Sequence, residues 1–300
     1  MKKFLAKVMA YLAFCIILMV AIPAIIDPYN VFHPLSARNN GIEPNKNYVK
    51  MTYILKNPDK YDAFLFGSSR VGAIHTEKLE DLNCYNMTYS MGTPAEALAN
   101  IQTMVDNGIC PKVIYLGVDN LSYTVDPEAH NNDASTASYE YLKSDIQNFV
   151  NHYCNIFTTI KSLSVIMSGE KTPGVAEIYE YGWWADYDYE SSYDWSQEGI
   201  TKGPVNRIDE TLSEIRQIKE ICDANDIRFI VFTNPMTYMT YEDSIDNGYN
   251  DFLSGLAEIT DYIDFSEFNG TETDHSGFVD NSHYSAQVGD MMIEILNNYN

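Results

Sequence analysis

The chain has 300 residues, a hydrophobic fraction of 45% and a formal net charge of −23 at pH 7. This composition is typical of a folded protein with a sizeable core, and it argues against intrinsic disorder. The excess of acidic side chains also argues against nucleic acid or anionic lipid as a ligand of the folded part, because like charges repel.

An apolar segment near the N-terminus predicts a membrane anchor. Val8–Ile26 contains no charged residue and follows Lys2, Lys3 and Lys7. At about 1.5 Å per helical residue, this segment is just long enough to cross a hydrocarbon core of roughly 30 Å. No Lys or Arg follows until Arg38, so the positive-inside rule predicts a single-pass protein with a cytoplasmic N-terminus and an extracytoplasmic main domain. The alternative is a cleaved signal peptide, although the run is long for one and lacks an Ala-x-Ala ending.

We divide the chain into three parts. Residues 1–26 are the cytoplasmic tip and transmembrane signal anchor, residues 27–60 are a stalk and the approach to the outer domain, and residues 61–300 are that domain. The segment Asp27-Pro-Tyr-Asn-Val-Phe-His-Pro34 predicts an extended stalk, because a proline disfavours helix in the residue before it.

Four cysteines follow the anchor, and their spacing does not suggest a metal site. In an oxidising compartment four cysteines can pair in three ways, and we expect buried thiols or at most one disulfide. These residues are Cys84, Cys110, Cys154 and Cys222.

Short apolar runs alternate with amphipathic helical patterns in the outer domain. The predicted strands are Ala63–Phe66, Cys84–Met87, Lys112–Val118, Arg228–Thr233 and Tyr262–Phe265. The predicted helices are Pro94–Asn107, Asn206–Asn225, Tyr249–Ile259 and Ser285–Asn297. This alternation predicts an α/β fold with three layers, α/β/α, around a mainly parallel, flavodoxin-like sheet.

An aromatic-rich insertion at about residues 123–204 interrupts the alternation. Aromatic rings beside carboxylates are suited to holding sugars, because rings stack on apolar sugar faces while acids accept hydrogen bonds from hydroxyls. The alternative is a helical insertion that packs its rings onto the sheet. The residues concerned are Trp183, Trp184, Trp195, Asp186, Asp188, Glu190 and Asp194.

Two segments carry candidate catalytic residues. In the first, an apolar strand ends in Gly67-Ser68-Ser69, and a serine at a strand-to-helix turn is exposed above the sheet edge near backbone N–H groups. In the second, Asp280 and His283 are three residues apart just before the last helix, so the carboxylate can orient the imidazole. Alone, the first segment is also explained by a tight turn and the second by a helix N-cap. Their combination favours a Ser–His–Asp triad.

These residues resemble the motifs of the SGNH or GDSL-like hydrolases. The chain is most similar to the membrane-anchored bacterial branch of that family, which acts in D-alanyl transfer to teichoic acid and related acylation of the cell envelope. The resemblance spans most of the outer domain. It rests on Asp27-Pro-Tyr, on Gly67-Ser68-Ser69 in place of Gly-Asp-Ser, on Asn86 and Gly92, and on Asp280-x-x-His283.

The resemblance implies roles for individual residues. Ser69 rather than Ser68 would be the nucleophile, His283 the base and Asp280 its partner. The N–H groups of Ser69 and Gly92 would form an oxyanion hole.

The third block of the family, Gly-x-Asn-Asp, corresponds to Gly117-Val-Asp119-Asn120, so the asparagine is displaced by one position. An ionised Asp119 cannot donate a hydrogen bond. Either Asn120 turns inward, or Asn86 replaces it, or only backbone donors remain.

Other polar residues are weaker candidates. Arg70 would steer an anionic substrate or pair with an acidic neighbour, and Asn234 ends a strand where it would line the cleft. His75, six residues after Ser69, is better explained by a surface position or by helix packing, and His275 does not lie just ahead of a helix as His283 does.

Together these features predict a serine esterase or O-acyltransferase that acts outside the cytoplasm on a cell-envelope polymer or glycan. No metal or organic cofactor is required. The resemblance implies the bacterial cell membrane as location and a membrane-bound acyltransferase as partner. The alternative is a scaffold or glycan-binding protein that keeps the fold without catalysis, which the displaced asparagine favours. A solute-binding lipoprotein is disfavoured, because Cys15 lies within the apolar run rather than after it.

Overall fold

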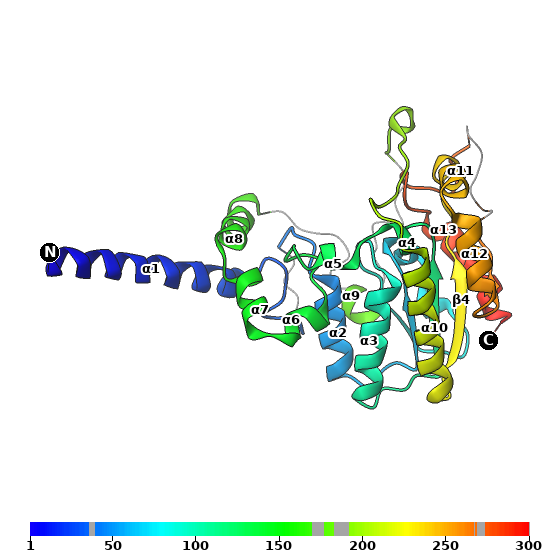
Figure 1. The fold of residues 1–300 in the computed structure, drawn as a ribbon, viewed down its shortest axis with the longest axis horizontal. Coiled ribbons are helices and arrows are strands. Elements are labelled where there is room, and N and C mark those ends of the chain that lie inside the picture. The colour runs from blue at the N-terminus through cyan, green and yellow to red at the C-terminus, as the bar shows by residue number, and fades with distance from the viewer. Residues whose placement is uncertain (36–39, 170–176, 183–191, 267, 269–273, 300) are drawn as a thin grey trace.

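A computed structural model describes residues 1–35, 40–169, 177–182, 192–266, 268 and 274–299. Helix α1 (Lys2–Ile26) is a single rod that leaves one end of an α/β domain (Figure 1). It is long and apolar enough to cross a membrane, and only 6% of its most apolar window is buried within the protein.

The sheet has five parallel strands in the order β2-β1-β3-β4-β5. All the predicted strands form, and three of them are shorter than expected by one or two residues. The strands are β1 (Ala63–Phe66), β2 (Cys84–Asn86), β3 (Val113–Val118), β4 (Arg228–Thr233) and β5 (Tyr262–Ile263).

Helices cover both faces of this sheet, which confirms the predicted three-layer fold. Because side chains alternate along a strand, Phe64 and Phe66 face one layer, and Ala63 and Leu65 face the other. One layer consists of α2 (Lys46–Lys56), α3 (Pro94–Asp106), α10 (Ile208–Ala224) and α12 (Tyr249–Ala257). The other consists of α13 (Ala286–Asn297) and the 3-10 helix η1 (Ser69–Ala73). The 3-10 helix η2 (Thr76–Lys78) and α11 (Tyr238–Asp246) are the remaining helices outside the insertion.

The described part of the insertion is helical. It contains α4 (Leu121–Thr124), α5 (Pro127–His130), α6 (Tyr139–Ser144), α7 (Ile146–Tyr153), α8 (Ile156–Ser168), α9 (Glu177–Glu180) and η4 (Trp195–Gln197). Tyr123 of this segment packs on Phe252 of α12, with ring centroids 5.1 Å apart. The predicted sugar-binding residues Trp183, Trp184, Asp186, Asp188 and Glu190 lie outside the described residues.

Residues 27–35 do not form the extended stalk that the prolines predict. The Asp27 carboxylate accepts hydrogen bonds from the backbone N–H groups of Val31, Phe32 and His33, at 2.7, 3.2 and 2.7 Å. These bonds curl the chain into a compact turn, and the Phe32 ring then packs on Phe149 of α7. The prediction was wrong because it considered only the effect of proline on the preceding residue. It did not consider that one carboxylate can accept hydrogen bonds from several following N–H groups.

Helix α2, which the sequence did not predict, is tied to the sheet by a buried lysine. The Lys50 ammonium is fully buried and donates to the backbone carbonyl oxygens of Asn86, Thr88 and Gly182. These bonds link α2 to the chain that follows β2. Burial lowers the pKa of the Lys50 amine, and a polar group buried in this way needs such partners, because transfer from water is otherwise costly.

All five cysteines are free thiols. Cys84 and Cys222 are buried as expected, whereas Cys110 is exposed. Burial raises the pKa of Cys84, and it raises that of Cys222 to about 12.

We therefore expect selective alkylation at pH 8. Cys110 reacts with a maleimide in the folded protein, while Cys84 and Cys222 remain unmodified until the chain is unfolded, because they lack both access and thiolate. Mass spectrometry of peptides before and after denaturation measures this. Modification of Cys222 at the rate of Cys110 would contradict the packing of α10.

Candidate active site

Ser69 is presented at the carboxyl end of β1 by a backbone that only glycine permits. A Cβ atom on Gly67 would lie 2.7 Å from Val71 Cγ1 and 2.9 Å from the Gly117 carbonyl oxygen. Ser68 is buried and caps η1, its Oγ accepting from the Arg70 N–H at 3.3 Å. Ser69 is half-buried and is the first residue of η1, where an N–H group has no acceptor within the helix.

The structure brings Ser69, His283 and Asp280 together. Ser69 Oγ lies 2.8 Å from His283 Nε2. On the other side of the ring, His283 Nδ1 lies 2.9 Å from both carboxylate oxygens of Asp280. The two ends of the domain thus meet in one chain of hydrogen bonds, with the geometry of a catalytic triad.

A tight loop holds the acid and the base. Phe278 and Tyr284 form an antiparallel bridge, and the N–H group of Val279 donates to the His283 carbonyl oxygen at 2.9 Å. Asp280 Oδ1 also accepts from the N–H groups of Ser282 and His283, at 2.7 and 2.9 Å. The loop therefore fixes Asp280 by its backbone as well as by the imidazole.

The Asp280 carboxylate is ionised at neutral pH. Burial alone would raise its pKa, but the hydrogen bond and charge of His283 and the two backbone N–H groups outweigh burial, so the pKa lies below its ordinary value of 3.8. A lowered pKa means that the stabilising contribution of Asp280 is complete above about pH 4 and is lost as the pH falls through the folded-state pKa. The orientation of His283 is accordingly maintained through the neutral range.

Arg70 does not face a substrate cleft, which corrects one of its two predicted roles. Its side chain is 0% exposed. One nitrogen, Nη1, lies 2.9 Å from Asp119 Oδ1 and 2.9 Å from Asn120 Oδ1, and Nε donates to the Ser282 carbonyl oxygen at 2.9 Å. The guanidinium pairs with an acidic neighbour and joins the end of β3 to the loop that carries His283.

Asn234 is likewise buried and does not line a cleft. Its Nδ2 donates to Asp119 Oδ2 at 2.9 Å, and its Oδ1 accepts from the Tyr284 hydroxyl at 3.1 Å. Asn234 therefore joins the end of β4 to Asp119 and to the residue after His283. The prediction that it binds substrate was wrong because all its polar atoms face the interior.

Two of the predicted oxyanion donors have other partners. Asn86 Nδ2 donates to the carbonyl oxygens of Val71 and Ile74, at 2.7 and 3.1 Å, so the Asn86 amide holds η1 rather than an oxyanion. The Gly92 N–H donates to the Tyr89 carbonyl oxygen at 3.2 Å. A Cβ atom on Gly92 would lie 2.6 Å from the Gly67 carbonyl oxygen, so Gly92 permits close packing beneath the serine.

Asn120 lies at the end of β3 and is turned inward. Its Oδ1 accepts from Arg70, and its Nδ2 donates to the Thr201 carbonyl oxygen at 2.8 Å. An amide nitrogen carries two hydrogens, so one donor of Asn120 is not used by Thr201.

The end of the insertion supports the histidine loop, the segment between Phe278 and Tyr284 that carries Asp280 and His283. The sequence did not reveal this support. Asn281 Nδ2 donates to the Gly199 carbonyl oxygen, and the Asn281 carbonyl oxygen accepts from Thr201 Oγ1, both at 3.1 Å. No local signal could have found these contacts, because they join positions about 80 residues apart.

The other histidines considered lie outside this arrangement. His75 is buried beside η2. His275 stacks on Trp195 with ring centroids 4.1 Å apart and an angle of 1° between the ring planes. Among the described residues, no group of three or more His, Cys, Asp or Glu side chains is arranged to hold a metal ion.

Comparison with known proteins gives a distant likeness of fold. No protein-family model and no curated protein matches the sequence. A crystal structure of a Bacteroides fragilis protein described as a candidate acylhydrolase aligns with a TM-score of 0.44 at 11% sequence identity. The alignment covers 82% of this chain and 93% of that one. The assignment of a function therefore rests on the geometry of the site.

Replacing Arg70 tests its role as a buried link. We expect Arg70→Met to lower the free energy of unfolding by about 3–5 kcal/mol, because it leaves the Asp119 carboxylate buried without its cation. Arg216→Met on the exposed side of α10 is the matched control and should change the value by less than about 0.5 kcal/mol. Chemical denaturation in detergent micelles measures both. Equal stability of the two variants would show that Arg70 is not a structural link.

Proposed function

We propose that this chain is a serine-dependent esterase or O-acyltransferase. The observation that carries the proposal is the continuous chain of hydrogen bonds from Ser69 through His283 to Asp280, at 2.8 and 2.9 Å. Ser68, the neighbouring hydroxyl, is buried and engaged in capping, so Ser69 is the nucleophile.

The reaction follows from the positions of the protons. Ser69 Oγ attacks the carbonyl carbon of an ester while His283 Nε2 takes the hydroxyl proton. Asp280 stabilises the imidazolium that forms. When the tetrahedral intermediate collapses, the ester C–O bond breaks and His283 returns the proton to the leaving alcohol. Water or a second alcohol then attacks the acyl-Ser69 ester, with His283 again acting as the base. The bond between the acyl carbon and Ser69 Oγ breaks, and His283 returns the proton to Ser69 Oγ.

Two groups are suited to stabilise the oxyanion. The Ser69 N–H has no acceptor within η1, and Asn120 has one amide hydrogen that is not donated to Thr201. Arg70 fixes the orientation of that amide by donating to its oxygen. Arg70 therefore positions both the Asn120 amide and, through the Ser282 carbonyl oxygen, the backbone next to His283.

The location and the substrate belong to the same proposal. The basic flank of α1 and its apolar length support a single-pass protein of the bacterial cell membrane with a cytoplasmic N-terminus and an outer catalytic domain. A cell-envelope polymer or glycan is then the accessible substrate. The resemblance of the sequence motifs to envelope acyltransferases supports acyl transfer with a membrane-bound acyltransferase as partner.

Covalent labelling tests the nucleophile. We expect a fluorophosphonate probe to label the wild-type chain and Ser68→Ala but not Ser69→Ala, because only the Ser69 hydroxyl contacts the base. In-gel fluorescence after a fixed exposure measures this. Labelling lost in Ser68→Ala but kept in Ser69→Ala would reverse the assignment, and a wild-type chain that is never labelled would favour the non-catalytic scaffold.

Substitution of the acid tests the proton pathway. Asp280→Asn should lower the kcat for p-nitrophenyl acetate by about 10²–10⁴-fold, because an amide neither selects the reactive imidazole tautomer nor stabilises its cation. Asp274→Asn is the matched control, since Asp274 accepts from the Ser276 N–H in a similar turn outside the triad. Its turnover should equal that of the wild type. Equal turnover in both variants would remove Asp280 from the mechanism.

A further inference from the structure

Helix α8 buries polar residues and exposes most of its apolar ones. Its three buried residues are Thr158, Thr159 and Ser162. Its exposed side chains include Ile156, Phe157, Ile160, Leu163, Ile166 and Met167. A helix on the surface of a water-soluble domain has the opposite arrangement, with its apolar stripe facing the core.

This apolar face is concentrated in one place on the molecule. More than half of the exposed large apolar side chains that the structure describes after residue 26 belong to α7 and α8. The Phe157 side chain is 79% exposed and that of Met167 is 85% exposed. Clustered exposure of this kind marks a contact surface rather than scattered single residues.

The face adjoins α1. Figure 1 shows α8 beside the end of α1 that is nearest the domain, and the two helices pack against each other. Thr159 Oγ1 lies 3.5 Å from the Met19 carbonyl oxygen. Met19 precedes the end of α1 by seven residues, or about 10 Å along the axis. An apolar medium that covers this part of α1 must also reach α8.

Four hydroxyl groups of α8 have hydrogen-bond acceptors within the protein, as an apolar surrounding medium requires. Thr158, Thr159, Ser162 and Ser164 each donate a hydroxyl hydrogen to a backbone carbonyl oxygen three to six residues earlier, at 2.7–2.8 Å. In lipid, a hydroxyl without a protein partner would be costly, and Ser and Thr commonly bond to their own helix. Small polar residues also suit the contact between two membrane helices.

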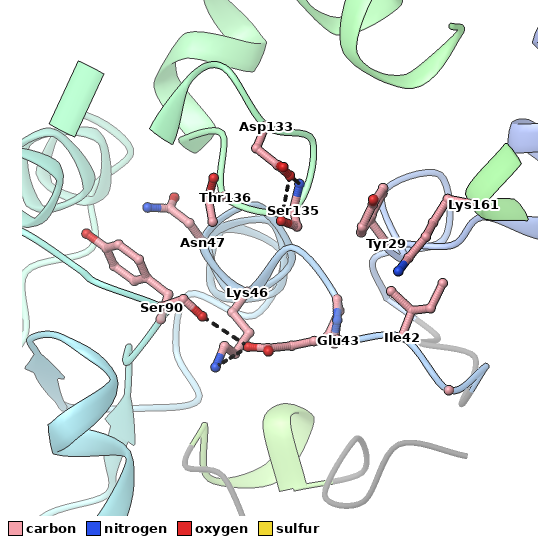
Figure 2. A pocket seen from close by; sticks show the side chains of 13 residues that line it. Tyr29, Ile42, Glu43, Lys46, Asn47, Ser90, Asp133, Ser135, Thr136 and Lys161 are labelled. Atoms are coloured by element: carbon pink, nitrogen blue, oxygen red, sulfur yellow. Dashed lines mark hydrogen bonds and ion pairs between the residues drawn. The ribbon is translucent and has the colours of Figure 1, made fainter. Parts of the chain in front are cut away.

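The charges near α8 support the same conclusion. The segment Asn155–Gly169 contains no acidic residue, although the chain has 42. Its one charged residue, Lys161, lines a pocket of about 380 Å³, and the other residues of this pocket come from the segment after α1, the start of α2 and the segments around residues 89 and 133. Figure 2 shows Lys161 beside Tyr29 and Ile42 in this pocket. Because the Lys161 side chain is directed into this pocket, the exposed apolar face of α8 carries no charged group.

We propose that α8 is embedded in the membrane leaflet next to the outer domain, with its exposed apolar face in lipid and its polar face against α1. The inference rests on the proposed membrane span of α1. The occupant of the face is the lipid bilayer itself, because the face continues the exposed apolar surface of α1. The contact at Met19, about 10 Å from the end of α1, matches the depth of roughly 5–10 Å at which interfacial helices lie. A second attachment point fixes the orientation of the domain, and with it the direction in which the active site opens.

A fluorescent probe on α8 tests this in the full-length chain. Cys15, Cys110 and Cys154 are replaced by serine, while the buried Cys84 and Cys222 are retained. Single cysteines are then introduced as Phe157→Cys on α8, Leu12→Cys in the middle of α1, and Gln217→Cys on the exposed side of α10. Each protein is labelled with nitrobenzoxadiazole and reconstituted in phosphatidylcholine vesicles with or without doxyl-labelled acyl chains.

We expect the probe at position 157 to emit at shorter wavelength than the probe at 217 and to lose most of its fluorescence in doxyl-labelled vesicles, as the probe at 12 does. Emission and quenching like those at 217 would overturn the proposal. A blue-shifted probe that doxyl lipids do not quench would also overturn it, since protein, such as a second copy of the chain, would then cover α8. Quenching at 12 without quenching at 157 would refute the embedding of α8 alone, whereas no quenching at either position would refute the membrane span as well.

Discussion

The buried guanidinium of Arg70 is the interaction on which the arrangement of the site depends. It joins Asp119 and Asn120 at the end of β3 to the backbone of the loop that carries His283. Without this cation, the Asp119 carboxylate would be buried without charge compensation. Because Arg70 directly follows Ser69, the segment that presents the nucleophile also fixes the position of the base.

The topology of the sheet explains why these groups meet. The chain passes from β1 to β2 on one side and then to β3 on the other, so the strand order reverses between β1 and β3, which is the position where open α/β sheets bind their ligands. Ser69 follows β1, Asp119 follows β3, and Asn234 follows β4. Arg70, Asp119 and Asn234 join these strand ends by hydrogen bonds. Arg70 and Asn234 also bond to Ser282 and Tyr284, so they hold the histidine loop next to Ser69.

The end of the molecule that carries α1 and α8 follows a different physical rule. The core of the α/β domain buries apolar side chains from both faces of the sheet, whereas α1 and α8 expose them. The turn at Asp27 connects these two environments, with its carboxylate satisfying three backbone N–H groups at the boundary. Aromatic contacts between this turn and α7 then hold the C-terminal end of α1 against the domain.

The sequence by itself determined the alternating strands and helices, the apolar N-terminal helix, and the choice of Ser69, Asp280 and His283 as partners. The strands and helices are periodic, Ser69 lies at a strand-to-helix turn, and Asp280 and His283 are three residues apart, so local rules describe each of these parts. The pairing of Ser69 with His283, 214 residues away, came from the combination of the two motifs and their resemblance to a known family. Only the tertiary structure decided that Arg70 and Asn234 are buried links, that Asn86 holds η1, that Asp27 curls the supposed stalk, and that α8 is apolar on its outer face. Most of those roles depend on partners distant in sequence, and whether a polar side chain binds a substrate or a neighbouring backbone depends on which groups the fold brings within hydrogen-bonding distance.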